Sequence, residues 1–94
     1  MDVAFVESNA IEAAQVLKAL SNQRRLLVLC ALCGGEKCVS ELEGIIGISQ
    51  SALSQHLAKL REDNMVATRR EAQTIFYSVS NGAVHDLLDC LNRI

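Results

Sequence analysis

Residues 49–61, with the sequence SQSALSQHLAKLR, restrict the fold of this chain more than any other stretch. Leu53, Leu57 and Leu60 are spaced three and four residues apart, so a helix places them in one apolar stripe. Ser49 is a favourable N-cap for such a helix. The stretch is therefore expected to be a helix that packs its leucines on a core.

The segment before this helix adds a second, shorter one. Ser40 and Glu43 have the S-x-x-E spacing of a capping box, which predicts a helix over residues 40–46. Gly47 then supplies a tight turn before Ser49. A short helix, a glycine turn and a capped second helix form a helix-turn-helix, whose second helix enters the DNA major groove.

The outward face of the 49–61 helix suits contact with DNA. It carries hydroxyls and amides, which can form hydrogen bonds with base edges, and cations, which suit phosphates. The expected DNA-contacting residues on this helix are Gln50, Ser51, Ser54, Gln55, His56, Lys59 and Arg61. Taken alone, the same residues would equally fit a solvated helix face, and it is the neighbouring segments that favour DNA.

A β-hairpin is expected directly after this helix. Residues 66–70 and 74–79 are rich in β-branched and aromatic residues, and residues 71–73 connect them. A hairpin in this position is the wing of a winged helix-turn-helix. Arg69 and Arg70 lie near its tip and are therefore expected to reach the minor groove or the phosphates.

Amphipathic helices are predicted at both ends of the chain. Residues 8–20 form the first, capped by Ser8 or Asn9, and Ser80 or Asn81 starts the last. The apolar stripe of the last helix consists of Val84, Leu87, Leu88, Leu91 and Ile94. Neither stripe has an obvious partner nearby in the sequence, so a homodimer formed through the first and last helices is expected.

The helix over residues 23–33 is expected to be the central core helix. Ser21 and Asn22 form a break and an N-cap before it, and its residues are apolar nearly all round. Gly34-Gly35 ends it, because glycine takes the left-handed C-cap conformation at no steric cost. The predicted fold class is mainly α with a small β-hairpin, a winged helix-turn-helix in the order ααααββα. Residues 1–94 are expected to form one DNA-binding and dimerisation domain.

Composition narrows the class of protein further. The chain is 50% hydrophobic with only 3% aromatic residues, a composition that favours a helical core of aliphatic side chains. Its net charge of −2 argues against a non-specific nucleic-acid binder. No apolar run is long enough for a membrane span, and the N-terminus lacks a basic signal region, so a cytoplasmic protein without a membrane partner is expected.

Three segments together resemble a known family: LKALSNQRRLLVLCAL, ISQSALSQHLAKLRED and VATRREAQTIFYSV. They are similar to the ArsR–SmtB family of dimeric winged-helix repressors. The resemblance implies a homodimer on a double-stranded DNA operator with an inverted repeat. It assigns base or phosphate contacts to Gln50, Ser51, Ser54, Gln55 and His56, and wing contacts to Arg69 and Arg70.

Within that family, the wing RREAQTIFY and the LC ending of the core helix are similar to the BigR, SqrR and HlyU-like branch. This similarity implies a repressor that reactive sulfur or oxidants release from its operator. Cys30 matches the first sensor cysteine of the branch. Its partner there lies on the last helix, just beyond Ile94. Either the natural chain continues past Ile94, or Cys90 substitutes, or the thiol switch is absent.

The cysteines also allow another ligand class. Reduced thiols at Cys30, Cys33 and Cys38 could bind a soft metal such as arsenic, cadmium or zinc, although packing is the default role of a free cysteine. A winged-helix interaction module that does not bind DNA is the alternative from a different functional class. An enzyme is not expected, because no nucleophile–base pair, phosphate loop or carboxylate pair has a meaningful spacing. No cofactor is expected either.

Overall fold

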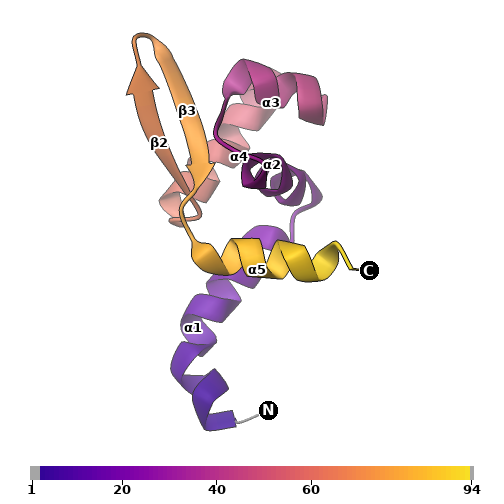
Figure 1. Ribbon diagram of the computed structural model, residues 1–94, viewed down its shortest axis with the longest axis vertical. Helices are drawn as coiled ribbons and strands as arrows, with labels where there is room; N and C mark the ends of the chain where they lie inside the picture. The colour runs from indigo at the N-terminus through magenta and orange to yellow at the C-terminus, as the bar shows by residue number, and fades with distance from the viewer. Residues whose placement is uncertain (1–2, 94) are drawn as a thin grey trace.

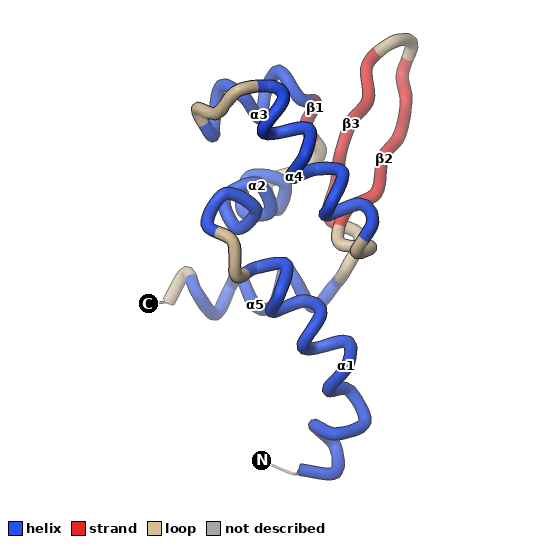
Figure 2. Tube along the Cα trace, turned by 180° about the vertical axis from the view of Figure 1, so that it is seen from behind, coloured by secondary structure: helices blue, strands red, loops and turns tan. Residues whose placement is uncertain are grey.

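The computed structural model describes residues 3–93 and confirms the winged helix-turn-helix (Figures 1 and 2). The five helices follow the expected order, and a two-residue strand that the sequence did not reveal precedes the third. The elements are α1 (Val3–Leu20), α2 (Gln23–Cys33), β1 (Lys37–Cys38), α3 (Val39–Ile46), α4 (Gln50–Glu62), β2 (Val66–Glu71), β3 (Thr74–Val79) and α5 (Gly82–Leu91).

The three strands form one antiparallel sheet in the order β1-β3-β2. Phe76 on the central strand pairs with Cys38 on one side and with Arg69 on the other. The hairpin turn is shorter than residues 71–73, because Glu71 still pairs with Thr74. Ala72 takes a positive φ of 54°, which is uncommon without a glycine and explains why the turn type could not be foreseen.

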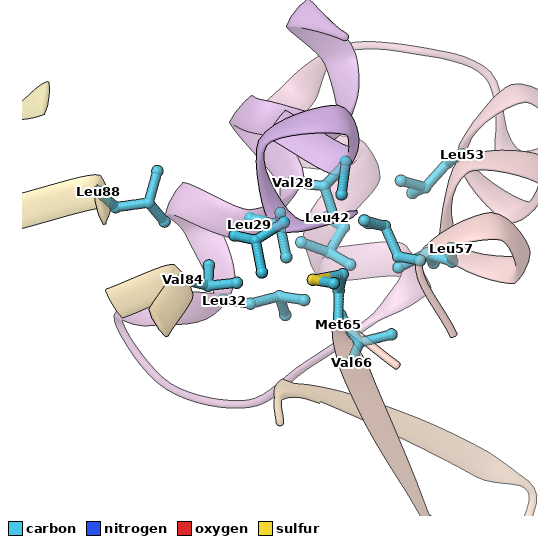
Figure 3. Close-up of a cluster of buried hydrophobic side chains, with 13 residues drawn as sticks. Val28, Leu29, Leu32, Leu42, Leu53, Leu57, Met65, Val66, Val84 and Leu88 are labelled. Carbon is cyan, nitrogen blue, oxygen red and sulfur yellow. The ribbon is translucent and has the colours of Figure 1, made fainter. Parts of the chain in front are cut away.

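A single aliphatic core joins α1, α2, α3, α4, α5 and the start of β2 (Figure 3). The predicted leucine stripe of α4 is confirmed: Leu53, Leu57 and Leu60 are buried, with at most 1% of each exposed. Leu42 of α3 is likewise fully buried. The inner faces of both helices of the helix-turn-helix are therefore fixed by hydrophobic burial, which leaves their outer faces free for a partner.

The junction between α4 and the hairpin is closed by hydrogen bonds. Asn64 turns the chain with a φ of 61°, and the Met65 N–H donates to the Leu60 carbonyl at 2.8 Å. Ser80, at the other end of the hairpin, donates from its N–H to the Met65 carbonyl at 3.0 Å and from its Oγ to the Asn64 carbonyl at 3.1 Å. Both ends of the hairpin are thus attached to the end of α4.

Two helix starts differ from the prediction. Helix α1 already runs from Val3, so Asn9 lies inside the helix and the cap predicted at Ser8 or Asn9 is wrong. The capping box lies two residues earlier than Ser40 and Glu43: Cys38 is the N-cap of α3, and its N–H donates to the Glu41 carboxylate at 3.1 Å. Pairing of Cys38 with Phe76 holds the chain extended up to that point, so the helix starts directly afterwards.

Helix α2 is less enclosed than an all-apolar core helix would be. Asn22 caps it as expected, since its side chain accepts hydrogen bonds from two backbone N–H groups of the first turn. Leu27 is 42% exposed and Cys30 is exposed, so only one face, with Val28, Leu29 and Leu32, is buried. Gly34 is right-handed at the C-cap, and Gly35 takes the positive φ of 134° instead.

Helices α1 and α5 leave apolar surface open. Ile11 is 79% exposed, Leu17 57% and Leu91 43%. A groove of about 460 Å³ between the two helices is lined mainly by apolar atoms, including those of Val16 and Leu87. The free end of α1 and the tip of the hairpin lie at opposite ends of the long axis (Figure 1). Ile94, assigned to the α5 stripe, lies outside the described residues. Within residues 3–93, no helix has the length and apolarity required to cross a membrane.

Candidate nucleic-acid interface

Helix α4 begins with the side-chain cap that the sequence predicted. Ser49 is extended, with φ −65° and ψ 156°, and its Oγ accepts a hydrogen bond from the Ala52 N–H at 3.2 Å. The left-handed turn at Gly47, with φ 77°, precedes it. These two residues set the angle at which α4 leaves α3, and this angle determines which face of α4 points outward.

The predicted contact residues of α4 do lie on its outer surface. Helical spacing puts Ser51, Gln55 and Glu62 opposite the leucine stripe, and all three are exposed. Gln50 and Ser54 are exposed on one flank of the helix, whereas His56 is half-buried on the other. The outer face therefore offers hydroxyl and amide groups. It also carries one carboxylate, Glu62, which was not among the predicted DNA contacts.

The two cations of α4 lie on opposite flanks. Arg61 and Ser54 line a shallow hollow beside Tyr77 of β3, on the side of the wing. Lys59 lies towards α1, near Gln15, and its Nζ forms an ion pair with Asp63 at 3.5 Å. Arg61 forms no hydrogen bond or ion pair with a residue in the described part of the chain. Of the two, Arg61 is therefore the better placed to contact a phosphate.

The two arginines of the wing point to opposite faces of β2, because neighbouring strand residues alternate. Arg70 shares its face with Thr68, which is paired with Tyr77, so Arg70 is on the face of the sheet that looks towards α4. It is exposed and has no polar partner among residues 3–93. Arg69 lies on the opposite face and already forms ion pairs within the protein.

Arg69 is held by two carboxylates and an aromatic ring. Its Nε donates to both carboxylate oxygens of Glu36, at 3.0 and 2.9 Å, and its Nη2 also donates to Glu36. Its Nη1 donates to Glu71 at 2.9 Å, and its Cζ lies 4.7 Å from the ring centre of Phe76. The hydrogen bond from Arg69 lowers the pKa of Glu36, and those to Glu36 and Glu71 raise the pKa of Arg69.

Glu36 was not singled out in the sequence. It lies 33 residues from Arg69, and no spacing rule connects a loop carboxylate to a strand cation at that distance along the chain. Only the sheet order brings the two together. Tyr77, which borders the hollow beside α4, was read as a strand residue and nothing more.

The cysteines separate into two locations. Cys30 is exposed and Cys33 half-buried, and both line a groove of about 400 Å³ between α2 and α5, together with Asp89. Burial raises the pKa of the Cys33 thiol, and nearby Cys30 and Asp89 raise it further. Cys90 is exposed and does not line this groove.

Cys38 belongs to the cap of α3, where its Sγ lies 3.2 Å from the Ser40 Oγ. The soft-metal alternative required Cys38 to join Cys30 and Cys33. Among residues 3–93, no group of three or more His, Cys, Asp or Glu side chains is arranged to hold a metal ion. The three cysteines of that alternative are therefore not gathered into one site.

Comparison with known proteins identifies the family. The profile of bacterial regulatory proteins of the arsR family matches residues 22–68, from the cap of α2 into the wing. The transcriptional activator HlyU of Vibrio cholerae is 47% identical over 94 residues, which are 100% of this chain and 87% of HlyU. The chain belongs to the arsR family.

Solved structures agree with this assignment over nearly the whole chain. The transcriptional repressor BigR from Xylella fastidiosa is 43% identical, with a TM-score of 0.92 over 97% of this chain and 93% of BigR. Reduced HlyU from Vibrio cholerae is 49% identical, with a TM-score of 0.86 over 94% of this chain and 93% of HlyU. A homodimeric winged helix-turn-helix DNA-binding domain from Mycobacterium bovis is 28% identical, with a TM-score of 0.78 over 93% of this chain and 82% of that domain.

Membership of this family defines the general activity. Regulators of the arsR family are dimeric and bind DNA operators, so this chain is a DNA-binding transcriptional regulator and not an enzyme. The element that reads DNA in a winged helix-turn-helix is its second helix, which here is α4.

Proposed function

We propose that the protein is a sequence-specific repressor that binds an inverted-repeat operator as a homodimer. The observation that carries this proposal is the outer face of α4, where Ser51, Ser54 and Gln55 are exposed while the leucines behind them are buried. Short hydroxyls and amides on a rigid helix can discriminate base edges in the major groove. Arg61 and Arg70 then supply phosphate contacts on the wing side of α4.

The dimer is proposed to form through α1 and α5. The exposed apolar side chains of Ile11, Leu17 and Leu91 and the groove between the two helices support this choice. In such a dimer the two copies of α4 would enter successive major grooves, about 34–36 Å apart. The homodimeric Mycobacterium bovis domain supports the same stoichiometry. Bound to bacterial DNA, the regulator would act in the cytoplasm.

Repression is proposed over activation. Both kinds of regulator occur among the relatives, since HlyU of Vibrio cholerae is named an activator and BigR of Xylella fastidiosa a repressor. A dimer that covers an operator blocks a promoter by occupancy alone, whereas activation needs an additional contact or competition with another protein. A reporter gene behind the selected operator should be silenced by the wild-type protein and expressed with the Gln55→Ala variant.

We further propose that thiol chemistry at Cys30 controls operator binding. Cys30 is exposed at the edge of a groove whose far wall is α5, the helix assigned to the dimer. A sulfur bridge from Cys30 to a thiol on α5 or beyond would change how α5 packs on α2 and, through the dimer, how the two α4 helices are spaced. The partner thiol is either a residue beyond Ile94 or Cys90.

The DNA-binding proposal is tested by selecting duplexes from a random library with the wild-type protein and measuring their affinity by fluorescence anisotropy. Enrichment of an inverted repeat is the expected result. Absence of any salt-dependent duplex binding would instead favour an interaction module that does not use DNA. For the switch, polysulfide treatment of the full-length protein should weaken duplex binding and give a bridged peptide that contains Cys30, and the Cys30→Ser variant should resist both changes.

A further inference from the structure

One side chain of the hairpin crosses the sheet and links its outer strand to the segment before α3. Cys38, Phe76 and Arg69 form a row across β1, β3 and β2. From β2, the Arg69 guanidinium passes over the Phe76 ring at 4.7 Å and reaches Glu36, next to the start of β1. Arg69 thereby connects the outermost strand of the wing to the segment that leads directly into α3.

The charges around Arg69 disfavour a phosphate contact. One guanidinium faces two carboxylates, Glu36 and Glu71, so this group of three side chains carries a net negative charge. The Nε–H is shared between both oxygens of Glu36, one Nη2 N–H also donates to Glu36 and one Nη1 N–H donates to Glu71, so three of the five guanidinium N–H groups are already used. A phosphate approaching Arg69 would have to displace a carboxylate that already has two-point geometry, the strongest arrangement for an arginine.

Arg70 has the opposite properties. It is exposed, has no polar partner within the described residues, and lies on the sheet face that looks towards α4. The residue next to it, Arg69, was assigned a DNA contact from its position near the tip and from the family resemblance. The two adjacent arginines are therefore distinguished by their surroundings and not by their type.

From this geometry we propose that Arg69 is a positioning residue, which braces the wing through Glu36, and that Arg70 is the phosphate-contacting arginine of the wing. The proposal rests on the DNA-binding function set out above. The brace attaches β2 to the loop before β1 and α3, so that the hairpin and the helix-turn-helix keep a fixed relative orientation. DNA binding needs both at once, because α4 and the wing contact neighbouring parts of one duplex.

The slope of binding against salt concentration separates the two roles. A phosphate contact contributes about 0.9 to the slope of log K against log[salt], whereas a positioning residue contributes nothing. With a duplex selected by the wild-type protein, Arg70→Ala should lower the slope by about 0.9 for each subunit. Arg69→Ala should weaken binding about threefold to tenfold, as expected for the loss of an exposed ion pair and a cation–π contact, and leave the slope unchanged.

Glu36 provides the sharper test, because simple electrostatics predicts the opposite sign. Removing a carboxylate from a DNA-binding protein should tighten DNA binding. If Glu36 braces Arg69, Glu36→Ala should instead weaken binding as much as Arg69→Ala does, and the double variant should be no weaker than either single one. Glu62→Ala is the matched control: its exposed carboxylate on the outer face of α4 has no polar partner among residues 3–93, so its removal should tighten binding, as simple electrostatics predicts.

Tighter binding by Glu36→Ala, or affinity equal to that of the wild type, would overturn the brace, and so would a lower salt slope in Arg69→Ala. Amide hydrogen exchange tests the brace without DNA: exchange in β2 and β3 should be faster in Arg69→Ala and Glu36→Ala than in Arg70→Ala. Should the wild-type protein select no duplex while the exchange result holds, the proposed DNA contacts would be refuted and the brace supported.

Discussion

Asp89 of α5 and Cys33 of α2 border the same groove, and the carboxylate raises the pKa of the thiol. Burial of Cys33 has the larger effect on that pKa, and the neighbouring Cys30 contributes as well. All three influences keep Cys33 protonated. The thiolate is the reactive form of cysteine. The groove therefore contains one exposed thiol, Cys30, and one thiol, Cys33, that is held in its unreactive protonated form.

Alkylation should therefore distinguish the two cysteines. With iodoacetamide at about pH 8, Cys30 should be modified faster than Cys33, because Cys30 is exposed and the raised pKa of Cys33 keeps its thiolate fraction low. Asp89→Asn should speed up modification of Cys33 by removing a nearby negative charge. Peptide mass spectrometry over a time course gives both rates. Equal rates in the parent protein would show that the groove does not protect Cys33.

Acid should weaken the start of α3. The hydrogen bond from the Cys38 N–H lowers the pKa of Glu41 below its ordinary value of 4.5, so the carboxylate form is favoured by folding. Its stabilising contribution is complete above that value and is lost as the pH falls through the lowered pKa. Glu41→Gln should reduce this acid dependence in urea unfolding followed from neutral to acidic pH. Glu62→Gln controls for the loss of one charge, and identical profiles for the two variants would contradict the cap.

Leu57 should be among the most costly positions to truncate. It is 1% exposed in the core between α4 and the rest of the domain, and Leu57→Ala should destabilise the protein by about 2–5 kcal/mol. Ile45→Ala, at a position that is 56% exposed, should change stability by less than about 0.5 kcal/mol. Urea unfolding followed by circular dichroism measures both. A loss at Ile45 as large as that at Leu57 would mean that the core is wrongly located.

Leu17 should be needed for dimerisation. Its side chain is 57% exposed beside the α1–α5 groove, and Leu17→Glu would place a charge in the proposed subunit contact. Sedimentation equilibrium should show a shift from dimer to monomer with the helical circular dichroism signal retained. Gln15→Glu adds the same charge at an exposed position that does not line this groove, and it should remain dimeric. A dimeric Leu17→Glu variant would exclude α1 from the interface.

Local chemistry made much of the fold predictable. Asn22 and Ser49 cap their helices as expected, because the competition between side chain and backbone that defines an N-cap involves only neighbouring residues. Leu53, Leu57 and Leu60 were correctly assigned to the core by helical spacing alone. Each of these features depends on fewer than about a dozen consecutive residues, within which periodicity is informative.

Two features that the sequence did not reveal depend on partners distant in sequence. The cap of α3 moved from Ser40 to Cys38 because β1 pairs with β3, and a two-residue strand has no detectable pattern of its own. The contact between Arg69 and Glu36 was equally unforeseen, because nothing near Arg69 in sequence reveals Glu36. Side-chain identity and spacing can suggest that a cation lies near DNA, but they cannot show whether that cation already forms an ion pair with a carboxylate of the protein.

Gln55 on the outer face of α4 provides the most direct test of the central claim that this face reads DNA. Gln55→Ala should cost about 1–3 kcal/mol of binding free energy on the selected duplex, because an amide contact with a base edge is lost. The melting temperature and the salt slope should not change, since Gln55 is exposed and uncharged. Fluorescence anisotropy at several salt concentrations measures both affinity and slope. Wild-type affinity in Gln55→Ala would contradict the claim that this face of α4 reads DNA.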